Sequence, residues 1–127
     1  MGLLRSAGPP DWHPASQELK SAVSKCVDVC SQYNMELSDI AIRYAFEISF
    51  LLPKPQDAAD GYVMGMLGAD QVSKSLDALR HVTSSSQTNR SNKFNPEENS
   101  ENICTAKVLE ILKPFSNYTW ESPPSDA

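Results

Sequence analysis

The sequence predicts an α/β fold that is mostly helical, has about one short strand and is incomplete on its own. Apolar residues recur at helical spacing in four stretches of the chain. One short apolar run, YVMGM at residues 62–66, fits a buried strand. A single strand needs hydrogen-bonding partners for its backbone N–H and C=O groups, and no second strand is predicted. The sequence therefore predicts one strand of a β-sheet but none of the strands that would pair with it.

The chain opens with the loop GPPDWHPAS at residues 8–16, which prolines keep from being helical. Ser16 is then the expected N-cap of a first helix near residues 16–33, with Glu18 in its first turn. Apolar residues recur through this range at helical spacing. They are Leu19, Ala22, Val23, Cys26, Val27, Cys30 and Tyr33.

A second helix is expected after a turn at Tyr33 and Asn34, with Ser38 as its cap and its end before Pro53. Its predicted apolar face consists of Ile40, Ala41, Tyr44, Ala45 and Ile48. Residues 51–60, LLPKPQDAAD, form a connector that two prolines keep from being helical. The predicted strand at 62–66 follows this connector.

Two further helices are predicted beyond the strand. The first spans residues 70–82, with Val72, Leu76 and Leu79 on its inner side. Residues 83–101 are polar and low in complexity, so we expect a disordered loop. The last helix spans residues 102–113 and is stopped by Pro114. Its apolar residues are Cys104, Val108, Ile111 and Leu112.

Composition narrows the range of partners. The chain has 127 residues, 40% of them hydrophobic, and a formal net charge of −5, which suits one globular domain. Its 11 basic residues are scattered singly, so no basic stripe favours nucleic acid or an anionic membrane. No apolar run approaches the ~20 residues of a spanning helix. The expectation is a chain that binds neither nucleic acid nor membrane.

The three cysteines are Cys26, Cys30 and Cys104. An odd count, with no apolar leader at the N-terminus, indicates reduced thiols and a cytoplasmic location. Cys26 and Cys30 are spaced to meet one metal ion together, but neither histidine lies in a zinc-ligand pattern with them. Burial as small hydrophobic residues is the preferred interpretation.

The segment Gly65–Gly68 joins the predicted strand to a helix, and this arrangement is typical of phosphate binding. Ordinary turn chemistry is nevertheless the preferred interpretation of these two glycines, and Asp70 near the helix start would repel an anion. No serine or cysteine lies in a nucleophile motif. His81 is expected to be a solvated cation late on its helix, and His13 to be structural. The residues by themselves indicate a helical piece with one candidate anion turn, and they indicate no reaction.

Four stretches of the chain resemble the aldo-keto reductase family, in particular its L-galactose dehydrogenase group. GLLRSAGPPDWHPASQELK resembles the part that follows the seventh strand of the family's (β/α)8 TIM barrel. LSDIAIRYAF resembles the helix before strand eight, and YVMGMLGADQV resembles that strand with its cofactor loop. LEILKPFSNYTW resembles the closing helix and tail. The resemblance implies that residues 1–127 are a partial aldo-keto reductase domain, the C-terminal portion of such a barrel.

The family implies NAD(P)-dependent oxidation or reduction of a sugar or aldehyde, with a tyrosine as general acid/base. That tyrosine, and the aspartate, lysine and histidine that work with it, belong to the first half of the barrel. No residue of this chain matches them, so no catalytic residue is predicted. The resemblance carries over part of the cofactor site, namely Gly2, Leu3, Gly65, Met66, Leu67, Gly68 and Gln71.

Departures from the family pattern refine this expectation. Gly68 replaces a serine of the loop, and Lys74 and Ser75 replace a Glu-Asn pair that faces the adenine. No Arg or Lys lies within residues 67–70 to meet a 2′-phosphate, which favours NAD over NADP. The sequence thus predicts a C-terminal fragment or shortened isoform of a sugar dehydrogenase, inactive alone. A non-catalytic interaction module that docks on a full-length barrel is the alternative.

Overall fold

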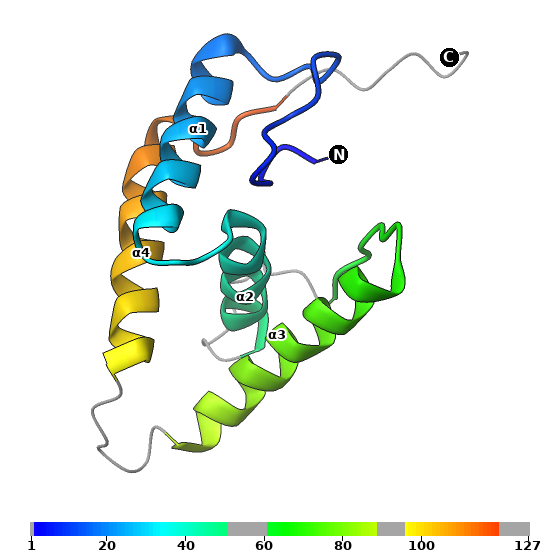
Figure 1. Cartoon of the computed structure of the whole chain (residues 1–127), viewed down its shortest axis with the longest axis vertical. Helices are drawn as coiled ribbons and strands as arrows, with labels where there is room; N and C mark the ends of the chain where they lie inside the picture. Colours follow the sequence, from blue (N-terminus) through cyan, green and yellow to red (C-terminus); the bar gives the residue numbers. More distant parts are fainter. Residues whose placement is uncertain (1, 51–60, 89–95, 120–127) are drawn as a thin grey trace. The chain divides into compact units, whose positions relative to one another are not determined.

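A computed structural model describes residues 2–50, 61–88 and 96–119 of the chain (Figure 1). Four α-helices lie in these ranges, α1 (Gln17–Gln32), α2 (Leu37–Phe50), α3 (Ala69–Thr88) and α4 (Pro96–Leu112). A short 3₁₀ helix, η1 (Lys113–Phe115), follows α4. The chain divides into unit 1, Met1–Leu37 with Ser100–Ala127, and unit 2, Ser38–Asn99. None of the helices in the described ranges is long and apolar enough to cross a membrane.

Unit 1 is an antiparallel pair formed by α1 and α4 (Figure 1). The Cys26 Sγ lies 4.0 Å from the Val108 carbonyl oxygen, and one turn along, the Cys30 Sγ lies 3.7 Å from the Cys104 Sγ. Moving four residues toward the C-terminus on α1, from Cys26 to Cys30, corresponds to moving four residues toward the N-terminus on α4, from Val108 to Cys104, as expected for antiparallel helices. All four residues are buried, so the contact is made by small side chains that let the two backbones approach closely.

The first helix forms where the sequence predicts it. The Ser16 hydroxyl accepts a hydrogen bond of 3.2 Å from the Leu19 N–H, which confirms Ser16 as the N-cap. At the other end, Asn34 has a φ of 54°, a left-handed conformation that asparagine tolerates and that turns the chain out of the helix. The buried residues of α1 all belong to the apolar residues that the sequence places at helical spacing between 19 and 33. They are Leu19, Ala22, Val23, Cys26 and Cys30.

Unit 2 has a small core between α2 and α3. It consists of Phe46, Ala78 and Val82, with Ile42 and Leu79 packed against it. The predicted cap of α2 is wrong, because the helix begins at Leu37 and places Ser38 in its first turn. The prediction also missed Phe46, which is buried, whereas the residues of the predicted α2 face other than Ile40 are only half-buried.

The inner face of α3 is rotated from the predicted one. Val72 and Leu76 are 44% and 47% exposed, whereas Ser75, Ala78 and Val82 are buried. The prediction followed the larger apolar residues, but the short side chain of Ala78 allows close packing against Phe46. Leu79 was assigned correctly to the inner side. The pattern of polar and apolar residues along α3 did not show that the smaller Ala78 would be buried and the larger Val72 and Leu76 exposed.

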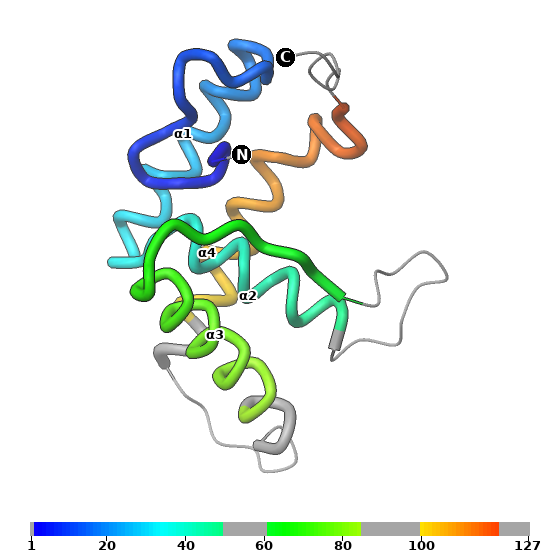
Figure 2. The backbone as a smooth tube through the Cα atoms, turned by 90° about the vertical axis from the view of Figure 1, so that its right-hand side faces the viewer, coloured from blue at the N-terminus to red at the C-terminus, as the bar shows by residue number. Residues whose placement is uncertain are grey.

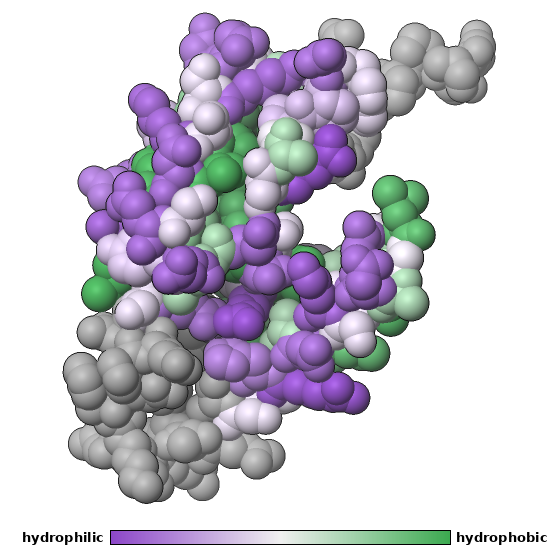
Figure 3. All heavy atoms as spheres, viewed as in Figure 1, coloured by the Kyte–Doolittle hydropathy of each residue, from purple (hydrophilic) through white to green (hydrophobic). Residues whose placement is uncertain are grey.

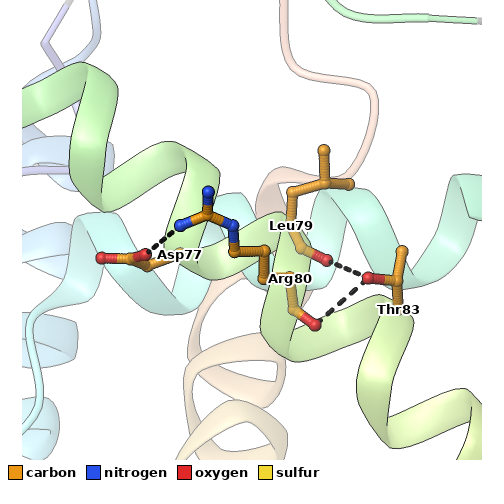
Figure 4. A network of polar contacts seen from close by, with 4 residues as sticks. All are labelled: Asp77, Leu79, Arg80 and Thr83. Carbon is orange, nitrogen blue, oxygen red and sulfur yellow. Dashed lines mark hydrogen bonds and ion pairs between the residues drawn. The ribbon is translucent and has the colours of Figure 1, made fainter.

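Polar interactions accompany the extension of α3 past its predicted end at residue 82. The Thr83 hydroxyl lies 2.9 Å from the Leu79 carbonyl oxygen and 3.1 Å from that of Arg80 (Figure 4). Arg80 also forms an exposed ion pair with Asp77 at 3.2 Å. Of the polar segment 83–101, residues 83–88 complete α3 and 96–101 open α4. Its remaining residues, 89–95, lie outside the described ranges, as does the connector 51–60.

The predicted strand at 62–66 is not a strand, and no strand occurs in the ranges that the structure describes. Residues 61–67 instead form a stretch without helix that leads into α3 (Figure 2). A strand is stable only when its backbone N–H and C=O groups form hydrogen bonds with a second strand, and the described residues supply none. The fold is therefore mostly helical as predicted, and the expected strand is absent from it.

The last helix ends one residue before its predicted end at 113 and begins well before its predicted start. It begins at Pro96, six residues before the predicted start at residue 102, where proline suits the first helical position. It ends at Leu112, and Pro114 lies in the first positions of η1. Cys104 and Val108 are buried as expected. Ile111 and Leu112 are half-buried.

Candidate functional site

The predicted cofactor loop folds as the entry to α3. The Gly68 carbonyl accepts hydrogen bonds from the N–H groups of Gln71 and Val72, at 3.2 and 3.4 Å, so Gly68 is the residue that caps the helix. The Gln71 side-chain Oε1 reaches back and accepts a hydrogen bond of 2.9 Å from the Leu67 N–H. This arrangement is close to a capping box, displaced by one residue toward the N-terminus. The loop is thus ordered by its own backbone and by one glutamine.

The two glycines of this loop differ in what surrounds them. A β-carbon placed on Gly65 would meet nothing within 4 Å, so the space beside it is open. A β-carbon on Gly68 would lie 2.6 Å from the Asp70 Oδ1, so the acidic side chain folds back over this glycine. Open space at Gly65 and a helix start at Gly68 suit an approaching pyrophosphate. The Asp70 carboxylate opposes it through its charge.

The segment that carries the loop has no basic residue before Lys74 to offset that charge. Residues 61–73 include no lysine or arginine, and the first basic residue of α3 is Lys74, which is exposed. Ser75, at the other position where the family pattern is changed, is buried. The entry to α3 therefore offers backbone N–H groups and a helix dipole to an anion, without a basic side chain.

Tyr62 fixes the segment before the loop to α2, and the sequence did not predict this role. Its hydroxyl accepts a hydrogen bond of 2.7 Å from the Ser49 hydroxyl and donates one of 3.2 Å to the Ala45 carbonyl. Its ring meets Phe46 edge to face, with centroids 6.2 Å apart. No sequence signal marked it, because either hydroxyl can donate or accept and only the fold brings Ser49 and Tyr62 together.

The predicted cofactor residues belong to both units. Gly65, Met66, Leu67, Gly68 and Gln71 lie together at the entry to α3 in unit 2. Gly2 and Leu3 lie in unit 1. Gly2 has a φ of 75°, in the left-handed region, and a β-carbon there would lie 3.3 Å from the Arg5 Nε. The Arg5 Nε in turn donates a hydrogen bond of 2.9 Å to the Gly8 carbonyl.

His13 is a structural residue of the opening loop. It is 3% exposed, and its Nδ1 accepts a hydrogen bond of 3.1 Å from the Ala15 N–H. Burial lowers the pKa of His13, and the positive charge of Lys20 lowers it further. A neutral imidazole held in this way supports the loop. The neighbouring Trp12 is 70% exposed and stacks on the imidazole, with ring centroids 6.1 Å apart.

One tyrosine is paired with a lysine, on the surface of unit 1. The Lys107 Nζ donates a hydrogen bond of 2.8 Å to the Tyr33 hydroxyl and lies 5.1 Å from the centre of its ring. Lys107 is exposed and Tyr33 is half-buried. The pair joins the end of α1 to α4.

The cysteines are buried side by side in unit 1. Cys26, Cys30 and Cys104 are at most 1% exposed, as free thiols. Burial raises the pKa of Cys26 to about 11 and that of Cys30 to about 12. Within the described ranges, no three residues among His, Cys, Asp and Glu are grouped to hold a metal ion. The preferred interpretation of Cys26 and Cys30 as buried small residues agrees with this packing.

The chain is similar to two sugar dehydrogenases, while no family model matches it. L-galactose dehydrogenase of Arabidopsis thaliana is 31% identical over 125 residues, which cover 96% of this chain and 32% of that enzyme. D-arabinose 1-dehydrogenase of Saccharomyces cerevisiae is 42% identical over 45 residues, which cover 35% of this chain and 13% of that enzyme. The chain thus spans about a third of the length of the first relative. These relatives confirm the family resemblance expected from the sequence.

Proposed function

We propose, on the premise that the chain resembles the C-terminal part of an aldo-keto reductase, that it contributes part of the cofactor site of an NAD-dependent sugar or aldehyde dehydrogenase. One observation carries this proposal: the likeness to L-galactose dehydrogenase extends over 96% of the chain, the loop before α3 included. In the complete enzyme this chain would form the last part of a (β/α)8 barrel. Its residues 62–66, which are not a strand in this structure, would correspond to the eighth strand once a neighbouring strand is supplied.

The loop before α3 would hold the pyrophosphate of the cofactor. Gly65 has open space beside it that phosphates could occupy, and the first N–H groups of α3 would be the donors that a helix start offers to an anion. By the family resemblance, Gly2 and Leu3 would also belong to the cofactor site of the complete enzyme, and Gln71 would belong to its adenosine end. The nicotinamide supplies the hydride chemistry when it is bound. The residues of this chain bind and orient, because the tyrosine, aspartate, lysine and histidine of the family's catalytic site have no counterpart here.

NAD is the proposed cofactor in preference to NADP. A 2′-phosphate adds negative charge that proteins usually meet with an arginine or lysine. Residues 67–70 carry no basic side chain, and Asp70 adds a negative one. Each phosphate charge brought near this carboxylate costs energy, and NADP carries more such charge than NAD.

Calorimetric titration of the purified chain with NAD and with NADP tests this proposal. We expect weak binding of NAD, with NADP binding more weakly. Gly68→Glu, which crowds the Asp70 carboxylate and adds charge, should abolish the heat of NAD binding. Gly61→Glu, at a site with open space, is the matched control and should retain it. Equal binding by both variants would place the cofactor elsewhere.

A turnover assay separates binding from catalysis. The purified chain, mixed with NAD and L-galactose or D-arabinose, should show no reduction of NAD above background. A general acid must lie within hydrogen-bond reach of the reacting group, and this chain lacks the residues that would supply it. Reduction of NAD at a rate that depends on chain concentration would show that the chain is an enzyme by itself.

A second candidate function is a non-catalytic module that docks on a full-length barrel or another sheet edge. The observation that favours it is the exposure of apolar side chains before and on α3 (Figure 3). Val63 and Leu67 are almost fully exposed, and Tyr62, Met64, Val72 and Leu76 are each more than one-third exposed. An exposed segment of this kind can add to the edge of a partner's sheet.

Mixing the chain with full-length L-galactose dehydrogenase, followed by light scattering after gel filtration, tests this second function. Complex formation that Val63→Lys and Leu67→Lys abolish, and that Lys107→Ala on unit 1 leaves intact, would support docking through this segment. Two separate peaks at all concentrations would exclude it for this partner.

A further inference from the structure

The contact between α1 and α4 contains a pair of thiols from opposite ends of the chain. The Cys30 Sγ lies 3.7 Å from the Cys104 Sγ, and these residues are separated by 74 positions. They are 1% and 0% exposed. A disulfide requires two sulfur atoms about 2.05 Å apart, so the two sulfur atoms must approach each other further before a bond can form. This geometry belongs to unit 1 and involves none of the residues proposed for the cofactor site.

We propose that Cys30 and Cys104 form a redox-convertible pair that locks α1 against α4. In the oxidising step one thiolate attacks a small disulfide such as oxidised glutathione, forming a mixed disulfide and releasing one thiolate of the reagent. The second cysteine thiolate then displaces the other half of the reagent. Two electrons pass from the cysteine pair to the reagent. The two thiol protons are taken up by its two released thiolates, giving two reduced molecules.

The fold selects this pair over the alternatives. Cys26 lies one turn before Cys30 on the same helix, and its Sγ faces the Val108 carbonyl oxygen at 4.0 Å. In an unfolded chain the short loop between Cys26 and Cys30 closes more than tenfold more readily than a loop of 74 residues. Native and unfolded chains are therefore expected to form different disulfides. This difference is the signature of a pair that the structure has placed together.

Burial makes the pair slow to react while the helices are closed. The raised pKa of Cys30 keeps its thiol protonated near neutral pH, and no reagent reaches a side chain with 1% exposure. Oxidation therefore follows opening of α1 from α4. Once formed, the bond closes a loop that includes all of unit 2, residues 38–99. The locked form should resist opening more than the reduced form does.

The test is oxidation of the full chain with oxidised glutathione near pH 8, followed by mass spectrometry of tryptic peptides. The relevant peptides are 26–43 and 94–107, and fragmentation of the linked species distinguishes Cys26 from Cys30. We expect free thiols to fall from three to one per chain, with Cys30 joined to Cys104. The melting temperature should rise by about 10 °C and return on reduction. Oxidation in full denaturant should instead join Cys26 to Cys30.

Variants keep the outcome decisive. Cys26→Ala should retain the intramolecular bond between Cys30 and Cys104. Cys30→Ala leaves only Cys26 as a partner for Cys104, and the yield of that bond should be at least tenfold lower. Cys30→Ala removes a buried side chain and could unfold unit 1, so circular dichroism should be used to check that this variant is folded. The peptide map of the wild-type chain decides the question even if the variant does not fold. The proposal is overturned by native Cys26–Cys30 pairing, by intermolecular disulfides only, or by three free thiols after prolonged oxidation.

Discussion

The Gln71 side chain accepts a hydrogen bond of 2.9 Å from the Leu67 N–H, across the turn that starts α3. The family resemblance assigned this glutamine to the cofactor, and the structure shows it holding its own loop. Both roles are compatible, because the amide Oε1 is committed to Leu67 while the Nε2 is a further donor. The loop is therefore shaped before any ligand arrives, a form of pre-organisation.

Substitutions at Gln71 separate the two roles. Gln71→Glu keeps an acceptor for the Leu67 N–H and places negative charge near the helix start, so the free energy of unfolding should change little. NAD binding should weaken, because the added charge repels phosphate. Gln71→Ala removes the hydrogen bond and should lower the free energy of unfolding by about 0.5–1 kcal/mol. Urea unfolding and calorimetric titration measure these effects. NAD affinity unchanged by Gln71→Glu would remove the glutamine from the site.

Asp70→Asn should strengthen NAD binding. The carboxylate folds back over Gly68, where a phosphate would approach, and a unit charge near 4 Å in water costs about 1 kcal/mol. Its removal should raise the affinity about fivefold. Asp77→Asn, with the same change in net charge on an exposed residue two turns further along α3, is the matched control and should have little effect. Equal gains in both variants would indicate a general charge effect and no local site.

Ser16→Ala should destabilise unit 1. The Ser16 hydroxyl caps α1 at the Leu19 N–H, and loss of such a cap costs about 1 kcal/mol. For a chain of this size the melting temperature should fall by about 4 °C. Ser21→Ala, at an exposed position inside the same helix, provides the comparison and should be neutral or slightly stabilising. A cap that contributes nothing would give both variants the same melting temperature.

Stability should fall as the pH is lowered through the ordinary pKa of histidine. Burial, and then Lys20, depress the pKa of His13 below its unfolded value of 6.5. The unfolded state therefore binds the proton first, and the free energy of unfolding decreases as pH falls below 6.5 until the folded pKa is reached. His13→Asn keeps a neutral acceptor and should flatten this dependence between about pH 7.5 and 5.5.

His81→Gln provides the control for this pH dependence. His81 is exposed on α3, and its replacement should leave the slope in place. Urea unfolding at several pH values measures all three proteins. If the dependence of unfolding free energy on pH persisted in His13→Asn and disappeared in His81→Gln, the prediction for His13 would be contradicted.

Local patterns predicted unit 1 well. Ser16 and the stripe from Leu19 to Cys30 define α1 completely, because a cap and a helical period are properties of neighbouring residues. Pro114 likewise marks the end of α4, which stops at Leu112. These features depend on a few residues close in sequence. No knowledge of the partner helix was needed to find them.

Features that depend on distant partners were predicted less well. The run from Tyr62 to Met66 has the composition of a strand, but a strand exists only when another segment pairs with it. The inner face of α3 was misassigned to Val72 and Leu76, because packing against Phe46 favours the smaller Ala78. The cofactor residues came from family resemblance, and Asp70 beside Gly68 required the folded loop to be seen.

The most direct test of the account is a titration of the isotopically labelled chain with NAD, followed by NMR of the backbone amides. The central claim is that the entry to α3 is part of a dinucleotide site. We expect the largest shifts at Gly65, Gly68 and Gln71, with smaller ones at Gly2 and Leu3, and loss of all of them in Gly68→Glu. Shifts centred elsewhere, or none at millimolar NAD, would contradict the claim.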